Sequence, residues 1–162
     1  MNSRGFTLVE LLVVIALIVT LTTFATLSWN TMSMKTAIEG EVKTIHADMM
    51  ATRLEALYQK RSRSVVVSGT NFSIYSSSDT TGTPISSRTL KYSFVPAGAN
   101  TVTFDTSGMT NGTQITLCVD AFHDLLKNSD ASVDSLVISQ ARLNLGKRDE
   151  GGNCNANDVK QK

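Results

Sequence analysis

Residues 6–29 form an apolar run of membrane-spanning length that contains a single charged residue, Glu10. A helix that crosses a bilayer needs roughly 20 apolar residues, so this run predicts a transmembrane helix that ends near Trp29. A carboxylate in hydrocarbon costs roughly 2.5–3.5 kcal/mol, and the run contains no Lys, Arg or His that could offset this cost. We therefore expect Glu10 to find a cationic partner elsewhere, either at a new N-terminus or on another subunit.

The residues before the run indicate its orientation. Arg4 is the only charged side chain among residues 1–5, and the positive-inside bias predicts Met1 in the cytoplasm and most of the chain outside. A secretory signal peptide has a longer basic region and a small-residue cleavage site, which the sequence around Trp29 does not supply. The plain alternative is an ordinary N-terminal anchor with a stray glutamate.

The segment Gly5-Phe6-Thr7-Leu8-Val9-Glu10, continued by Leu11-Leu12-Val13-Val14-Ile15, resembles the class III signal of type IV pilins and type II secretion pseudopilins. This resemblance implies that residues 1–5 are a leader, that a prepilin peptidase cuts between Gly5 and Phe6, and that Phe6 is N-methylated. Cleavage creates an ammonium group at Phe6. Opposite charges attract strongly at low dielectric, so Glu10 is expected to pair with the Phe6 amine of a neighbouring subunit.

The chain beyond Trp29 keeps a helical pattern but becomes amphipathic. One apolar stripe consists of Ile38, Val42, Ile45 and Met49, and an adjacent stripe consists of Met50, Leu54 and Leu57. Both have helical spacing, and together they predict a face that packs on a sheet. No proline interrupts residues 6–61, so we expect one helix with a transmembrane half (6–29) and an amphipathic half (30–61).

Residues 62–162 are predicted to form a β-rich domain. Segments rich in β-branched and aromatic residues, bounded by Gly, Asn, Ser and Asp, predict strands at 64–67, 72–75, 90–94, 101–104, 114–119, 135–138 and 142–145. Residues 146–162 are expected to be an irregular tail. The predicted fold class is α+β and pilin-like, with a long N-terminal helix packed on an antiparallel sheet.

The soluble part also resembles the GspH/FimT family of minor pilins and pseudopilins. The segments that carry this resemblance are 51–56, 65–67, 102–105 with Gly108, 115–118, and 136–139 leading to Arg142, with Cys154 beyond.

Two cysteines, Cys118 and Cys154, are predicted to lie outside the cytoplasm, where disulfides persist. We expect them to pair and to tie the polar tail to the apolar strand that contains Cys118. The alternative is two unpaired thiols.

The sequence contains no nucleophile motif, P-loop or dinucleotide-binding motif, so no enzyme, cofactor or metal site is predicted. Neither histidine, His46 nor His123, has metal-ligand spacing with the cysteines. The oxygen-rich tail around Asp149 and Asn155 is an alternative Ca²⁺ site, although its order does not fit an EF-hand and a solvated turn is the plainer interpretation.

Three cations near the tail, Arg142, Lys147 and Arg148, are an alternative DNA-binding patch. Some FimT-like minor pilins bind DNA through a basic C-terminal motif of the Gly-Arg type, but here Ala141 precedes Arg142. The acidic pair Asp149 and Glu150 also weakens the field that phosphates would meet. A solvated charged surface is the interpretation that the pattern favours.

The resemblances together predict a structural minor pilin near the tip of a type IV pilus, anchored in the bacterial inner membrane by a single helix with its domain in the periplasm before it enters the filament. A minor pseudopilin of a type II secretion system and a DNA-binding minor pilin for DNA uptake are the alternatives. The implied partners are other major and minor pilins, the prepilin peptidase, the inner-membrane assembly platform and membrane lipid.

Overall fold

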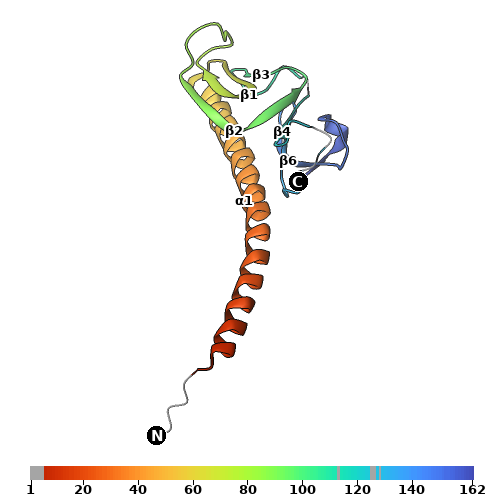
Figure 1. Cartoon of the computed structure of the whole chain (residues 1–162). Helices are drawn as coiled ribbons and strands as arrows, with labels where there is room; N and C mark the ends of the chain where they lie inside the picture. The colour runs from red at the N-terminus through yellow and green to blue at the C-terminus, as the bar shows by residue number, and fades with distance from the viewer. Residues whose placement is uncertain (1–5, 113, 125–126, 128) are drawn as a thin grey trace. The chain divides into compact units, whose positions relative to one another are not determined.

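The structure, a computed structural model, describes residues 6–112, 114–124, 127 and 129–162, and it describes the backbone but not the side chains of residues 24–28 (Figure 1). The predicted leader, residues 1–5, lies outside the described residues. The chain divides into two compact units, Met1–Met34 and Lys35–Lys162. One helix, α1 (Leu8–Gln59), contributes residues to both units.

The helix is uninterrupted over 52 residues, as the absence of proline predicted. Among the described residues, no helix meets the combined requirement of length and hydropathy for a membrane span.

The helix ends at Gln59, two residues before the predicted bound of 61. Lys60 adopts a left-handed conformation with φ of 51°, and the amide of Arg61 donates to the carbonyl of Ala56 at 3.3 Å. This six-to-one hydrogen bond is the Schellman ending, which satisfies a carbonyl that the last helical turn would otherwise leave open.

The helix face of the second unit is confirmed for one predicted stripe and only in part for the other. Ile38, Val42, Ile45 and Met49 are fully buried. The buried face then continues through Thr52 and Ala56, which keep the alternating spacing of three and four residues. In the adjacent stripe Met50 and Leu57 are half-buried, whereas Leu54 is 50% exposed.

Seven strands form one antiparallel sheet in the order β3-β1-β2-β4-β5-β6-β7. The strands are β1 (Arg63–Tyr75), β2 (Ser86–Ala97), β3 (Thr101–Phe104), β4 (Ile115–Asp120), β5 (Ser135–Ile138), β6 (Leu143–Arg148) and β7 (Val159–Gln161). The predicted α+β architecture, a long N-terminal helix with an antiparallel sheet, is thereby confirmed. The bounds predicted for β3 and β5 are correct, whereas the first two predicted strands are parts of the single strand β1.

The irregular tail predicted for residues 146–162 is wrong in two places. Strand β6 runs on to Arg148, and the chain returns through the short 3₁₀ helix η1 (Ala156–Asp158) to form β7. Gly146 permits this return, because a Cβ placed on it would lie 2.3 Å from Cγ1 of Val159.

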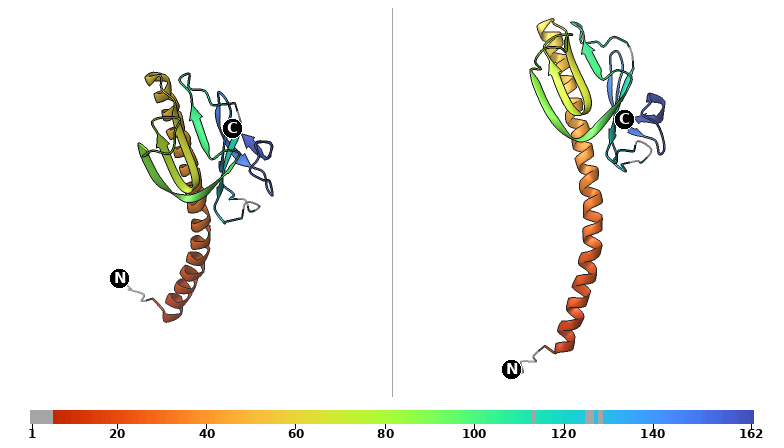
Figure 2. Two further views of the ribbon diagram at one scale, coloured as in Figure 1. Left: turned by 90° about the horizontal axis from the view of Figure 1, so that it is seen from above. Right: turned by 45° about the horizontal axis from the view of Figure 1, so that its top comes forward.

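The central strand β4 is covered on both faces, which explains why residues 115–119 are all buried. Its cross-strand partners show how the faces divide, since Leu117 lies opposite Leu136 while Cys118 lies opposite Ser135. Cys118 belongs to a buried cluster with Val137, Cys154 and Val159 of the C-terminal segment. In the views of Figure 2 this segment lies on the side of the sheet away from the helix.

A bulge in β2 connects the sheet to the helix. The register between β1 and β2 shifts between Gly69 and Asn71, so that residues 90–93 leave the regular ladder. The carboxylate of Glu41 accepts the amides of Lys91 and Tyr92 there, at 2.5 and 3.1 Å. The helix therefore supplies the hydrogen-bond acceptors for these two strand amides at the bulge.

Candidate functional site

The first unit presents an apolar helix without a polar side. The large apolar side chains from Leu8 to Leu21 are between 45% and 79% exposed. A helix that is apolar all round normally lies among other apolar groups, and a contiguous exposed apolar surface marks an interaction site. This surface is suited to contact lipid or other apolar helices on every side.

The start of the helix is capped by a threonine. Thr7 Oγ1 accepts the amide of Glu10 at 3.2 Å, and the Thr7 carbonyl accepts the amide of Leu11 at 3.2 Å. Thr7 therefore occupies the N-cap position, and Glu10 stands three residues later, which is the spacing of a capping box. Sequence analysis attached no role to Thr7, although the pattern Thr-x-x-Glu was a usable signal.

The residues of the predicted charge pair, Phe6 and Glu10, lie at the N-terminal end of this helix. Phe6 is 78% exposed and Glu10 is exposed, whereas Gly5 lies outside the described residues. No ion pair of Glu10 occurs among the residues that the structure describes. Its carboxylate can therefore accept a cation from another chain, while cleavage, methylation and the charge pair itself stay predictions.

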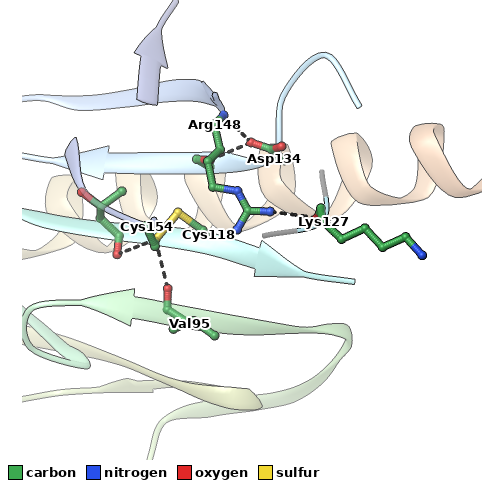
Figure 3. The surroundings of a disulfide bond; sticks show 8 residues. Val95, Cys118, Lys127, Asp134, Arg148 and Cys154 are labelled. Atoms are coloured by element: carbon green, nitrogen blue, oxygen red, sulfur yellow. Dashed lines mark hydrogen bonds between the residues drawn. A yellow bond between two sulfur atoms is a disulfide. The ribbon is translucent and has the colours of Figure 1, made fainter. Parts of the chain in front are cut away.

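The disulfide between Cys118 and Cys154 is confirmed, with an S–S distance of 2.06 Å (Figure 3). Both cysteines are buried, with Ala97 and Ala156 packed against their cluster. The bond ties the C-terminal segment to β4, the strand that contains Cys118, as predicted.

Two of the three cations expected to form a DNA-binding patch, Lys147 and Arg148, contact other residues of the domain. Arg148 is 2% exposed, and its Nη2 donates to the carbonyl of Lys127 at 3.2 Å (Figure 3). Lys147 Nζ lies 2.9 Å from Oδ2 of the buried Asp134. The expectation that Arg148 is available to phosphates is therefore wrong for this conformation, because burial keeps its guanidinium inside the fold.

Asp134 organises this region, and sequence analysis missed it. Its carboxylate accepts the amide of Arg148 at 2.8 Å and the hydroxyls of Ser135 and Ser129 at 2.7 and 3.2 Å, in addition to the Lys147 ammonium. A buried carboxylate requires such partners. No local sequence signal identifies it, because Lys147 and Arg148 are brought to it only by the sheet register.

The remaining candidate residues are dispersed. Arg142 is exposed and directly precedes β6, and DNA binding through it stays a prediction. His46 Nε2 lies 3.1 Å from the carbonyl of Leu143 and connects the helix to the sheet. In the described part of the tail, Asp149 pairs with Lys160 at 2.9 Å, and no group of three His, Cys, Asp or Glu that could hold a metal occurs among the described residues.

Two comparisons connect this geometry to known proteins. Residues 1–26 match a family described as the prokaryotic N-terminal methylation motif. This match covers the apolar helix start, the Thr7 cap and Glu10. Comparison with the sequences of curated proteins finds no match.

Among solved structures, the chain is similar to two crystal forms of the type IV minor pilin FimU of Pseudomonas aeruginosa. The first has a TM-score of 0.54 at 20% identity over 66% of this chain and 90% of that chain. The second has a TM-score of 0.51 at 19% identity over 67% and 87%. This likeness shows that the chain has the pilin fold.

Proposed function

We propose that this chain, which combines a prokaryotic N-terminal methylation motif with the pilin fold, is a minor pilin of a type IV pilus. The observation that carries the proposal is the motif at residues 1–26, placed at the start of a helix whose apolar side chains are exposed. The pilin fold of the C-terminal unit supports it. The proposed role is structural, near the filament tip, where the subunit would initiate or support assembly.

In this proposal a prepilin peptidase cuts after Gly5 and methylates Phe6. Residues 6–29 hold the processed chain in the inner membrane, with the domain on the periplasmic side. During assembly the apolar helix exchanges lipid for the helices of neighbouring pilins. The Glu10 carboxylate then neutralises the Phe6 amine of a neighbour, and since each charge is costly alone in an apolar medium, this pair would set the axial position of the subunit.

A minor pseudopilin of a type II secretion system is the second candidate, since the motif at residues 1–26 suits it equally well. Both candidates are filament subunits without catalysis. The presence of the chain in sheared surface pili would separate the first from the second.

The test is the intact mass and N-terminal sequence of the protein purified from its own membrane. We expect a chain that begins at methylated Phe6 and lacks two hydrogens for the Cys118–Cys154 bond. A chain that still begins at Met1, or that is cut after residue 25, would refute the proposed processing and assembly.

A further inference from the structure

The chain that follows β3 contains the only Asn-Gly pair of the sequence, Asn111 followed by Gly112. A bridge between Phe104 and Thr110 extends the antiparallel pairing beyond β3. This register sets Asn111 opposite Thr103, at the outer edge of the sheet. Asn111 is therefore the last residue of this pairing before the chain turns away.

The turn after Asn111 favours glycine at the next position. Gly112 has φ of 79°, which lies in the left-handed region that glycine adopts without strain. Its amide donates to the carbonyl of Thr110 at 2.7 Å and closes a three-residue turn around Asn111. A Cβ built on Gly112 would meet none of the described atoms within 4 Å beyond its chain neighbours, so the space beside its nitrogen is open.

The side chain of Asn111 is less constrained than those of two other asparagines. Both Asn111 and the glycine after it are exposed, and no hydrogen bond of the Asn111 side chain occurs among the described residues. In contrast, Asn100 Oδ1 accepts the hydroxyl of Thr101 at 3.1 Å. Asn144 Nδ2 donates to Gln161 Oε1 at 2.7 Å. The Asn111 amide is therefore free to rotate toward its own main chain.

An asparagine next to glycine has a reaction open to it that needs only water. The main-chain nitrogen of the glycine attacks Cγ of the asparagine, and the new C–N bond closes a five-membered imide. The bond from Cγ to the side-chain nitrogen breaks, and ammonia leaves with the proton that the glycine amide gives up. Water then opens the imide at either carbonyl, which gives aspartate or isoaspartate. A side chain on the second residue would shield the attacking nitrogen, and glycine has none.

The fold opposes this reaction only weakly at Gly112. Its amide must first leave the carbonyl of Thr110, which is a single hydrogen bond in an exposed turn. Such turns open at little free-energy cost, whereas residues inside a sheet open only together with their neighbours. Asn144 is of the second kind, because it lies in β6 between β5 and β7.

We propose that Asn111 is a site of spontaneous deamidation in the folded chain, with the nitrogen of Gly112 as the attacking group. Either product adds one carboxylate, which changes the formal net charge of the full chain at pH 7 by −1, from +1 to 0. Isoaspartate also inserts one methylene group into the main chain opposite Thr103. The inference does not depend on the proposed function, since it needs only the chain and water.

The test follows the wild-type full chain, purified in detergent, during incubation in mildly alkaline buffer. Peptide mapping detects the mass gain of an amide-to-acid exchange, and labelling by an isoaspartyl methyltransferase detects isoaspartate. The tryptic peptide 92–127 contains both Asn100 and Asn111, so its fragment ions compare the two within one molecule. The same incubation of the isolated peptide gives the rate without the fold. Asn111→Gln is the matched control, because it keeps an amide whose attack would have to close a larger ring.

We expect Asn111 of the folded chain to convert within about tenfold of its rate in the isolated peptide, because the exposed turn opens readily. Asn100 and Asn144 should stay unchanged over the same period, and Asn111→Gln should show no conversion at residue 111. A rate in the folded chain more than about tenfold below that of the peptide would mean that the turn protects Asn111, and would overturn the inference. Conversion of Asn100 as fast as that of Asn111 would overturn it as well.

Discussion

Thr7 Oγ1 accepts a hydrogen bond from the amide of Glu10 at 3.2 Å, so Thr7, the second residue after the predicted cleavage site, caps the helix that contains Glu10. The first amides of a helix have no partner within it, and an N-cap side chain satisfies one of them. Thr7 thus fixes the backbone from which the Glu10 carboxylate projects. Thr7 therefore holds the backbone of the first helical turn, and Glu10 places a charged side chain on that turn.

Thr7→Ala is expected to loosen this first turn. An N-cap threonine contributes roughly 1 kcal/mol, so the amide of Glu10 should exchange about fivefold faster in the variant. Thr7→Ser keeps the hydroxyl and should exchange at the wild-type rate. Hydrogen exchange of the purified chain in detergent measures both, and equal rates in Thr7→Ala and the wild type would contradict the capping role.

Glu10→Val should separate membrane insertion from assembly. The substitution removes the only charge from the apolar run, so insertion should be as efficient as in the wild type or better. Incorporation into filaments should be lost, because the Phe6 amine of a neighbour would have no counter-charge. Membrane fractionation and a pull-down with other pilins measure the two steps, and Lys43→Ala on the exposed part of α1 serves as a control. Normal incorporation of Glu10→Val would remove the role given to Glu10.

The helix face and strand β3 could be predicted from the sequence because each depends on residues close together in the chain. The row from Ile38 to Met49 repeats at the helical period, and its burial follows directly. The alternation in 101–104 predicted β3 with its correct bounds. The cysteine pair followed from the expected compartment, and the sheet brings the two Cα atoms to 5.8 Å.

The features that were missed depend on contacts between distant segments. Strand β7 has only three residues and contains a lysine, so no alternation marks it, and it pairs because β6 presents an edge with Gly146 at the point of closest approach. The exposure of Leu54 could not be predicted because the spacing alone does not say where the sheet ends. Asp134 was missed for the same reason, since two of its partners, Lys147 and Arg148, come from the distant strand β6.

Loss of the disulfide should destabilise the domain without changing its fold. The bond joins residues 36 positions apart, and the chain-entropy estimate for a loop of this size is about 4 kcal/mol. The double variant Cys118→Ser with Cys154→Ser should therefore unfold at clearly lower urea concentration. Pulse proteolysis of the full chain in detergent across a urea series measures this midpoint, with the reduced wild type as the matched comparison. An unchanged midpoint would show that the buried cluster around Val137 holds the tail without the bond.

Asp134→Ala should cost more than any surface substitution in the domain. Removal of one partner from a buried ion pair costs roughly 3–5 kcal/mol, and this substitution takes away the carboxylate that faces the Lys147 ammonium and accepts the amide of Arg148. Asp130→Asn is the matched control, since Asp130 is exposed and lies 4.0 Å from Lys35. That control should stay within about 0.5 kcal/mol of the wild type. Similar urea midpoints for the two variants would contradict the organising role of Asp134.

The turn after β3 should make part of the stability pH-dependent. Asp105 Oδ1 accepts the hydroxyl of Ser107 at 2.6 Å and the amides of Ser107 and Met109 at 2.8 and 2.9 Å. The Ser107 hydroxyl, helped by these amides, holds the pKa of Asp105 below its ordinary value of 3.8. Because the folded-state pKa is depressed, the contribution is present above pH 3.8 and is lost as the pH falls through the folded-state pKa. The melting temperature of Asp105→Asn should therefore lie below that of the wild type at pH 7, and the gap should close in strong acid. A gap of the same size at both pH values would mean that the charge of Asp105 contributes nothing and that the turn is held by neutral hydrogen bonds alone.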